Sequence, residues 1–130
     1  MTLRIKLSGI FGAVLFLLTI GFGIWIALQG KPYGMVLFTV HKLTAIGATV
    51  LAALFCFSIL KNASAGGKVT ALVIVAVISV IALLATGALM SINNDPVASY
   101  LRIIHSVSSI SLAISGGGAI FFLRNILMNK

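Results

Sequence analysis

The side chains of this sequence that titrate close to neutral pH are two histidines, His41 and His105. Each follows a proline by nine residues, Pro32 in one case and Pro96 in the other, and each lies near the start of a long apolar stretch. An ionisable group in such a stretch is costly in lipid, which favours a functional role over a hydrogen-bonded structural one. Since imidazole nitrogens are common metal ligands, the matched pair predicts a metal held between them.

The remaining composition excludes several kinds of chemistry. A single cysteine, Cys56, rules out an intramolecular disulfide framework, a CxxC redox motif, covalent haem attachment through CxxCH and iron–sulfur ligation. There is no Glu, and Asp95 is the only Asp, so paired-carboxylate catalysis and carboxylate-rich metal sites are excluded as well. A closed zinc site needs four ligands, and the chain has only three His and Cys residues in all.

The overall composition is that of a protein dissolved in lipid. Of 130 residues 61% are apolar and only 8% are charged, with a mean hydropathy of +1.25. Ordinary soluble domains are about 25% charged. The formal charge of +8 does not predict nucleic-acid binding, because the bases are scattered at the ends of apolar runs and do not form a basic stripe.

Four apolar stretches predict four membrane-spanning helices, at about residues 7–28, 33–60, 69–92 and 97–123. Each is long enough to cross a hydrocarbon core of roughly 30 Å. The connections, residues 29–32, 61–68 and 93–96, are short, and short connections make successive helices antiparallel. We therefore predict an all-α membrane protein, an up-down-up-down four-helix transmembrane bundle that forms a single domain over residues 1–130.

The distribution of bases predicts the orientation. Cytoplasmic ends of membrane helices carry an excess of Lys and Arg. Six of the nine bases lie at the two termini and in the middle connection, so both termini are expected to be cytoplasmic and both histidines to lie in the outer half of the membrane. The expected location is a prokaryotic inner membrane. Those six bases are Arg4, Lys6, Lys61, Lys68, Arg124 and Lys130.

The two halves of the chain resemble each other. The Pro and His pairs recur at an offset of 64 residues. Residues 17–21 resemble residues 83–87 at an offset of 66, which pairs Gly21 with Gly87 and would require a two-residue difference in loop length. This pattern predicts a duplicated two-helix hairpin.

Helix geometry then predicts a site for a flat macrocycle. The second and fourth helices run in the same direction, so their histidines share one depth, and diagonal helices of a square bundle lie roughly 11–14 Å apart. Small residues at the same depth on the other two helices would leave room for the ring edges. They are Gly21, Gly23 and Gly87.

Basic side chains near the outer surface could bind the propionates of a porphyrin. Arg102 lies three residues before His105 on the same helix face, although a base at that position can also simply extend to the membrane interface. Lys31 and Tyr33 in the first connection are further candidate partners. Lys42 points about 100° away from His41 and is expected to extend to the interface.

In these features the chain resembles four-helix membrane cytochromes of the b type. His41 and His105 are similar to the axial pair in each four-helix half of the haem A synthase family, and to one of the two pairs in cytochrome b561-like proteins. The resemblance implies a half-module with one haem b and two histidine ligands. The absence of Glu departs from the acidic residues that haem A synthases use, so that oxidative chemistry is not implied.

The expected function is electron transfer near the outer membrane face, with quinol or a redox protein as partner, because a haem with both axial positions filled has no site for substrate. A complete enzyme is less expected than an electron carrier. The alternatives are a non-catalytic haem-binding, assembly or anchor subunit of a larger redox complex, a pigment protein, and a metal carrier that also uses Met35 or Met90. Besides the lipid bilayer, a second copy of the chain is another candidate partner.

Overall fold

The computed structural model describes residues 3–61, 66–92 and 97–128. This part of the chain forms four α-helices and no strand: α1 (Leu3–Gln29), α2 (Met35–Leu60), α3 (Gly67–Ile92) and α4 (Ser99–Met128). All four are long and apolar enough to cross a membrane. The predicted all-α architecture with four transmembrane helices is confirmed.

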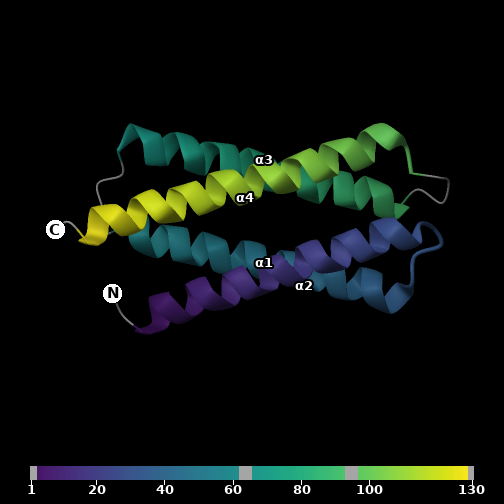
Figure 1. Ribbon diagram of the computed structural model, residues 1–130, viewed down its shortest axis with the longest axis horizontal. Coiled ribbons are helices and arrows are strands. Elements are labelled where there is room, and N and C mark those ends of the chain that lie inside the picture. Colours follow the sequence, from purple (N-terminus) through teal and green to yellow (C-terminus); the bar gives the residue numbers. More distant parts are fainter. Residues whose placement is uncertain (1–2, 62–65, 93–96, 129–130) are drawn as a thin grey trace. The chain divides into compact units, whose positions relative to one another are not determined.

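Contacts divide the chain into two compact units, residues 1–62 and residues 63–130. In each unit two long helices lie side by side and run in opposite directions, α1 with α2 and α3 with α4 (Figure 1). We call these units the first and the second hairpin and describe each by itself. A single domain over residues 1–130 stays a prediction.

The helix boundaries differ from those predicted in two ways. First, α1 starts at Leu3, α3 starts at Gly67 and α4 continues to Met128, beyond the apolar stretches that defined the prediction. Lys and Arg favour helix, so a helix does not stop where its first base occurs. Second, α2 and α4 start at Met35 and Ser99, two residues later than predicted. The carbonyls of Gly34 and Ala98 accept the first backbone N–H bonds of these helices and thus mark their starts.

Gly30 ends α1 and starts the first connection. Its φ of +68° is a left-handed conformation, and its N–H donates to the carbonyl of Ile26 at 3.1 Å. Glycine adopts this conformation without steric cost, which explains its place just after a helix end. The predicted connection at residues 93–96, with Asp95 and Pro96, and most of the middle connection lie outside the described residues.

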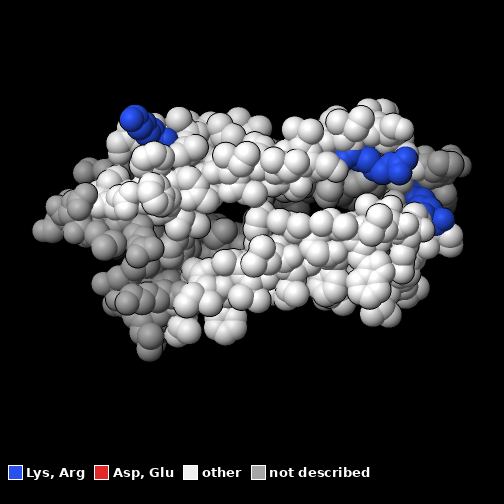
Figure 2. All heavy atoms as spheres, in the orientation of Figure 1, with Lys and Arg blue, Asp and Glu red and all other residues white. Residues whose placement is uncertain are grey.

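The helix surfaces suit lipid and not water. Large apolar side chains are exposed along the helices: Leu17 is 68% exposed, Ile81 62% and Ile114 70%. Lys and Arg side chains are absent from the middle of the face that Figure 2 shows and lie toward its ends. Soluble monomers rarely expose contiguous apolar patches above a few hundred Å². The expected integral membrane protein is thus supported, while its sidedness and its particular membrane stay predictions.

Small residues bring the two helices of each hairpin close together. In the first hairpin a Cβ built on Gly12 would lie 3.4 Å from Leu51, and one on Gly47 would lie 3.0 Å from Leu15. Helices in lipid associate largely through such close packing, because lipid chains remove the hydrophobic drive that operates in water.

Candidate functional site

His41 lies on α2 and faces α1 within the first hairpin. Its Nδ1 is 3.0 Å from the backbone carbonyl oxygen of Thr19. Its ring packs against Gly23, where a built Cβ would lie only 3.1 Å from Cε1. Because a carbonyl oxygen can only accept, Nδ1 must carry the proton and donate it to Thr19.

The glycine explains how a side chain reaches a carbonyl inside a helix. In an α-helix the carbonyl of Thr19 already accepts the N–H of Gly23, four residues on. Its second lone pair is open to a neighbouring helix only if nothing covers it, and Gly23 has no side chain to do so. Gly23 thus provides both the space for the imidazole and its access to the acceptor.

His105 on α4 has a different acceptor on α3. Its Nδ1 is 2.8 Å from Oγ1 of Thr86. That hydroxyl donates to the carbonyl of Ala82 at 2.7 Å and lies 3.3 Å from the carbonyl of Leu83. A hydroxyl has one proton and can also accept, so when that proton goes to a carbonyl, Oγ1 accepts from Nδ1 of His105.

Nδ1 of each imidazole is thus hydrogen-bonded to an oxygen of the neighbouring helix. A ring that donates from Nδ1 has its lone pair on Nε2. This is the form in which histidine binds a metal, with the second ring nitrogen donating to a supporting group. The hydrogen-bonded oxygens also fix the orientation of each ring.

The two hairpins place these groups at equivalent positions. The helix pairs α1/α3 and α2/α4 start 64 residues apart, and the His–Gly pairs, His41 with Gly23 and His105 with Gly87, follow the same offset. A Cβ on Gly87 would lie 3.6 Å from Cε1 of His105. The predicted hairpin repeat is thus visible in the packing, with Gly23, and not Gly21, as the counterpart of Gly87. No difference in loop length is needed.

A second contact between the two helices of a hairpin also recurs at the offset of 64 residues. It is an apolar contact in the first hairpin and a hydrogen bond in the second. Leu15 meets Gly47 in the first hairpin, and the counterparts Ser79 and Ser111 form a hydroxyl–hydroxyl hydrogen bond of 3.0 Å in the second. The described buried polar side chains all belong to the second hairpin. They are Ser79, Thr86, Ser108 and Ser115.

Gly21 does not contact the histidine of its hairpin. It is exposed on α1, and a Cβ built there would meet nothing within 4 Å. Two residues along a helix correspond to a rotation of about 200°, which places Gly21 away from the face that carries Gly23. Among the three predicted glycines, Gly23 and Gly87 contact an imidazole.

The predicted propionate partners lie near the same helix ends as the histidines. Arg102 is exposed on the first turn of α4, and its guanidinium donates to the carbonyl of Val97 at 3.5 Å. In the first hairpin Tyr33 stacks on Phe38 with ring centroids 5.3 Å apart. The ammonium groups of Lys31 and Lys42 lie over these two rings, at 5.7 and 4.3 Å.

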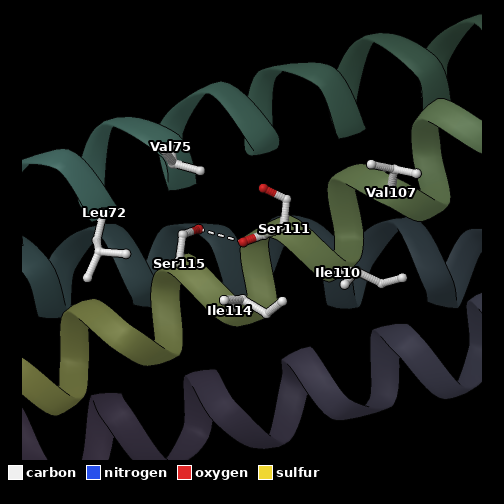
Figure 3. Close-up of a pocket in the computed structure, with 7 residues that line it drawn as sticks. All are labelled: Leu72, Val75, Val107, Ile110, Ser111, Ile114 and Ser115. Atoms are coloured by element: carbon white, nitrogen blue, oxygen red, sulfur yellow. Dashed lines mark hydrogen bonds between the residues drawn. The ribbon is translucent and has the colours of Figure 1, made fainter.

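A groove of about 510 Å³ runs along the second hairpin (Figure 3). Its lining is apolar apart from two serines, and the hydroxyl of Ser115 donates to the carbonyl of Ser111 at 2.6 Å. Of these two serines, Ser111 is nearer to His105 along the chain. It follows the histidine by six residues, about 9 Å along α4. Neither histidine lines this groove, and its other lining residues are Leu72, Val75, Val107, Ile110 and Ile114.

Among the described residues no group of three or more His, Cys, Asp and Glu side chains comes together. Each hairpin has one histidine whose Nδ1 is hydrogen-bonded to the neighbouring helix. Comparisons with protein-family models, with curated proteins and with solved structures give no match to this chain. The inference of function therefore depends on the residues themselves.

Proposed function

We propose that this protein is a membrane-embedded b-type cytochrome in which Nε2 of His41 and Nε2 of His105 are the two axial ligands of one haem b. The observation that carries the proposal is the matched support of the two rings. Nδ1 of each ring is hydrogen-bonded to an oxygen on the neighbouring helix, at 3.0 and 2.8 Å, which is the arrangement in which Nε2 serves as the ligand. A histidine with a purely structural role would not require an equivalent histidine, with an equivalent hydrogen bond at Nδ1, in the other hairpin.

The level of the two ligands supports the same proposal. His41 and His105 each lie six residues after the start of their helix, about 9 Å along the axis. Four consecutive spans alternate in direction, so α2 and α4 both start on one side of the membrane. Each hairpin then supplies one imidazole at the same depth.

The chain's other residues fit a macrocycle at that depth. Gly23 and Gly87 let each imidazole lie against the neighbouring helix, and the apolar helix sides exclude water. Arg102, Lys31 and Tyr33 lie toward the nearer membrane surface, where cations and a phenol would bind the propionates. Bis-histidine haem supplies one-electron exchange and has no open position for substrate. We accordingly assign the protein electron transfer with quinol or a redox protein at that surface.

The proposal is tested by haem content after purification in detergent from cells with ample haem. Wild type is expected to contain one haem per chain, and His41→Ala and His105→Ala each to lose it or to change to a high-spin spectrum. Thr39→Ala and Ser109→Ala are matched controls, because each hydroxyl bonds only a carbonyl of its own helix. Retention of a low-spin haem in either histidine variant would show that the ligand pair is wrong.

Reduction by a quinol analogue separates electron carrier from haem holder. A carrier that exchanges electrons with quinol is reduced within seconds of mixing. A protein that binds haem but is reduced neither by quinol nor by a small redox protein would instead be a haem-binding, assembly or anchor subunit.

A further inference from the structure

We propose that Thr86 is a positioning residue for His105, which it holds through its side-chain hydroxyl. The inference rests on the proposed function, because the contact between Thr86 and His105 affects haem binding only if His105 is a haem ligand. The sequence alone does not distinguish Thr86 from the other threonines of the chain. Its contacts within the second hairpin distinguish it from them.

The hydroxyl of Thr86 occupies the place where the first hairpin has a bare carbonyl. Thr19 and Leu83 are separated by the repeat offset of 64, so their carbonyls are equivalent. His41 donates directly to the first of them, at 3.0 Å. In the second hairpin Oγ1 of Thr86 lies 3.3 Å from the carbonyl of Leu83 and 2.8 Å from Nδ1 of His105. Thr86 thus lies between the imidazole and the backbone.

Burial makes this hydroxyl hard to replace by water. Thr86 is only 6% exposed, and its hydroxyl donates to Ala82 at 2.7 Å while it accepts from the ring. The hydroxyl therefore bonds both the backbone of its own helix and the imidazole. Removing it would take this hydrogen-bond partner away from Nδ1 of His105, at a place where the loss of a hydrogen bond is expensive.

The two histidines are consequently supported in different ways. The acceptor of His41 is a backbone oxygen, which no substitution of Thr19 removes, whereas the acceptor of His105 is a side chain. A hydrogen bond to Nδ1–H makes the imidazole a more basic ligand and fixes its orientation. A more basic ligand favours the ferric state. Loss of the bond should thus weaken haem binding and raise the midpoint potential.

A pair of isosteric substitutions tests the proposal. Thr86→Val removes the hydroxyl and keeps the shape, and Thr19→Val does the same in the first hairpin, where the hydroxyl bonds only Leu15 of its own helix at 2.7 Å. Thr86→Val should lose haem to an acceptor protein about 10- to 100-fold more readily, the usual effect of removing a group that supports a ligand, and its midpoint potential should rise. Thr19→Val and the conservative Thr86→Ser should behave as wild type.

A second readout does not depend on haem. In the haem-free full chain with ¹⁵N-labelled histidine, NMR should show both rings protonated at Nδ1. Thr86→Val should change the signals of one ring, and Thr19→Val those of neither. Circular dichroism compares the helix content of the two variants. Equal behaviour of Thr86→Val and Thr19→Val, or a Thr86→Ser variant as defective as Thr86→Val, would overturn the role of Thr86.

The two proposals fail in different ways. If wild type holds no haem, the proposed function fails, and the NMR comparison still decides whether Thr86 holds His105. If haem is bound through both histidines and Thr86→Val changes neither the haem nor the ring signals, only the role of Thr86 is lost.

Discussion

Two groups determine how each imidazole is presented: the acceptor of its Nδ1–H and the glycine against its ring. Both contacts are tight for His41. A Cβ added to Gly23 would lie 3.1 Å from Cε1 of the ring, and the carbonyl oxygen of Thr19 lies 3.0 Å from Nδ1. The ring cannot retreat from an added methyl group without lengthening its hydrogen bond. Gly87 is less restrictive, since a Cβ there would make an ordinary contact at 3.6 Å.

Gly23→Ala should therefore be destabilising, whereas Gly21→Ala should not. Overfilling a packed contact costs about 1–3 kcal/mol. At Gly21 the added methyl group meets nothing and replaces the poorest non-proline helix former. Denaturation of the protein in detergent measures both free energies of unfolding, and Gly87→Ala should lie close to Gly21→Ala. Equal stability of Gly23→Ala and Gly21→Ala would show that His41 does not pack as described.

The sequence allowed the prediction of some of these residues and not of others. His41 and His105 could be selected because an ionisable residue is unusual in an apolar helix, and Gly23 and Gly87 because they lie at a similar depth on the other two helices. The same criterion also selected Gly21, which does not contact the histidine of its hairpin. The acceptor of His41 is a backbone carbonyl, and a backbone group has no sequence signature. Thr86 had one weak signal, a hydroxyl next to Gly87, but threonines in membrane helices commonly bond only their own backbone.

The element that carries each histidine is a helical hairpin. Apolar runs and short connections were sufficient to predict the four helices, because length and hydropathy determine a membrane span. They did not determine the contacts within a hairpin, since apolar residues occur on every side of each helix. The register became visible in the paired contacts Leu15–Gly47 and Ser79–Ser111.

Engineered cysteine pairs test this register in a Cys56→Ala background. Ser79→Cys with Ser111→Cys should form a disulfide under mild oxidation, because the two hydroxyls are 3.0 Å apart. Leu15→Cys with Gly47→Cys should do so in the first hairpin. Counting free thiols with a maleimide of large mass detects the bond. Ser79→Cys with Ser106→Cys is the control, because Ser106 is exposed and more than a turn from Ser111. More efficient bonding in the control would contradict the register.

At the scale of the whole molecule, the sequence predicts which side of the membrane each connection faces. Lys61, just after the end of α2, and Lys68, in the first turn of α3, are exposed, and the base-rich side should be cytoplasmic. The first connection, with Lys31 and Tyr33, should then face outward. With that sidedness the histidines, six residues into α2 and α4, would lie in the outer half of the bilayer.

Labelling of intact cells with a membrane-impermeant maleimide tests the sidedness. In the Cys56→Ala background, Gly34→Cys should react in intact cells, because Gly34 is exposed with open space around it. Lys61→Cys should react only after the membrane is permeabilised. The reverse pattern would place the haem site in the cytoplasmic half of the membrane.

The measurement that tests the central claim most directly is the reduced-minus-oxidised visible spectrum of the purified wild-type protein. Two imidazole ligands predict a low-spin haem, and thus a sharp reduced α-band in the b-type region with one haem per chain. A colourless protein purified from cells with ample haem would contradict the claim.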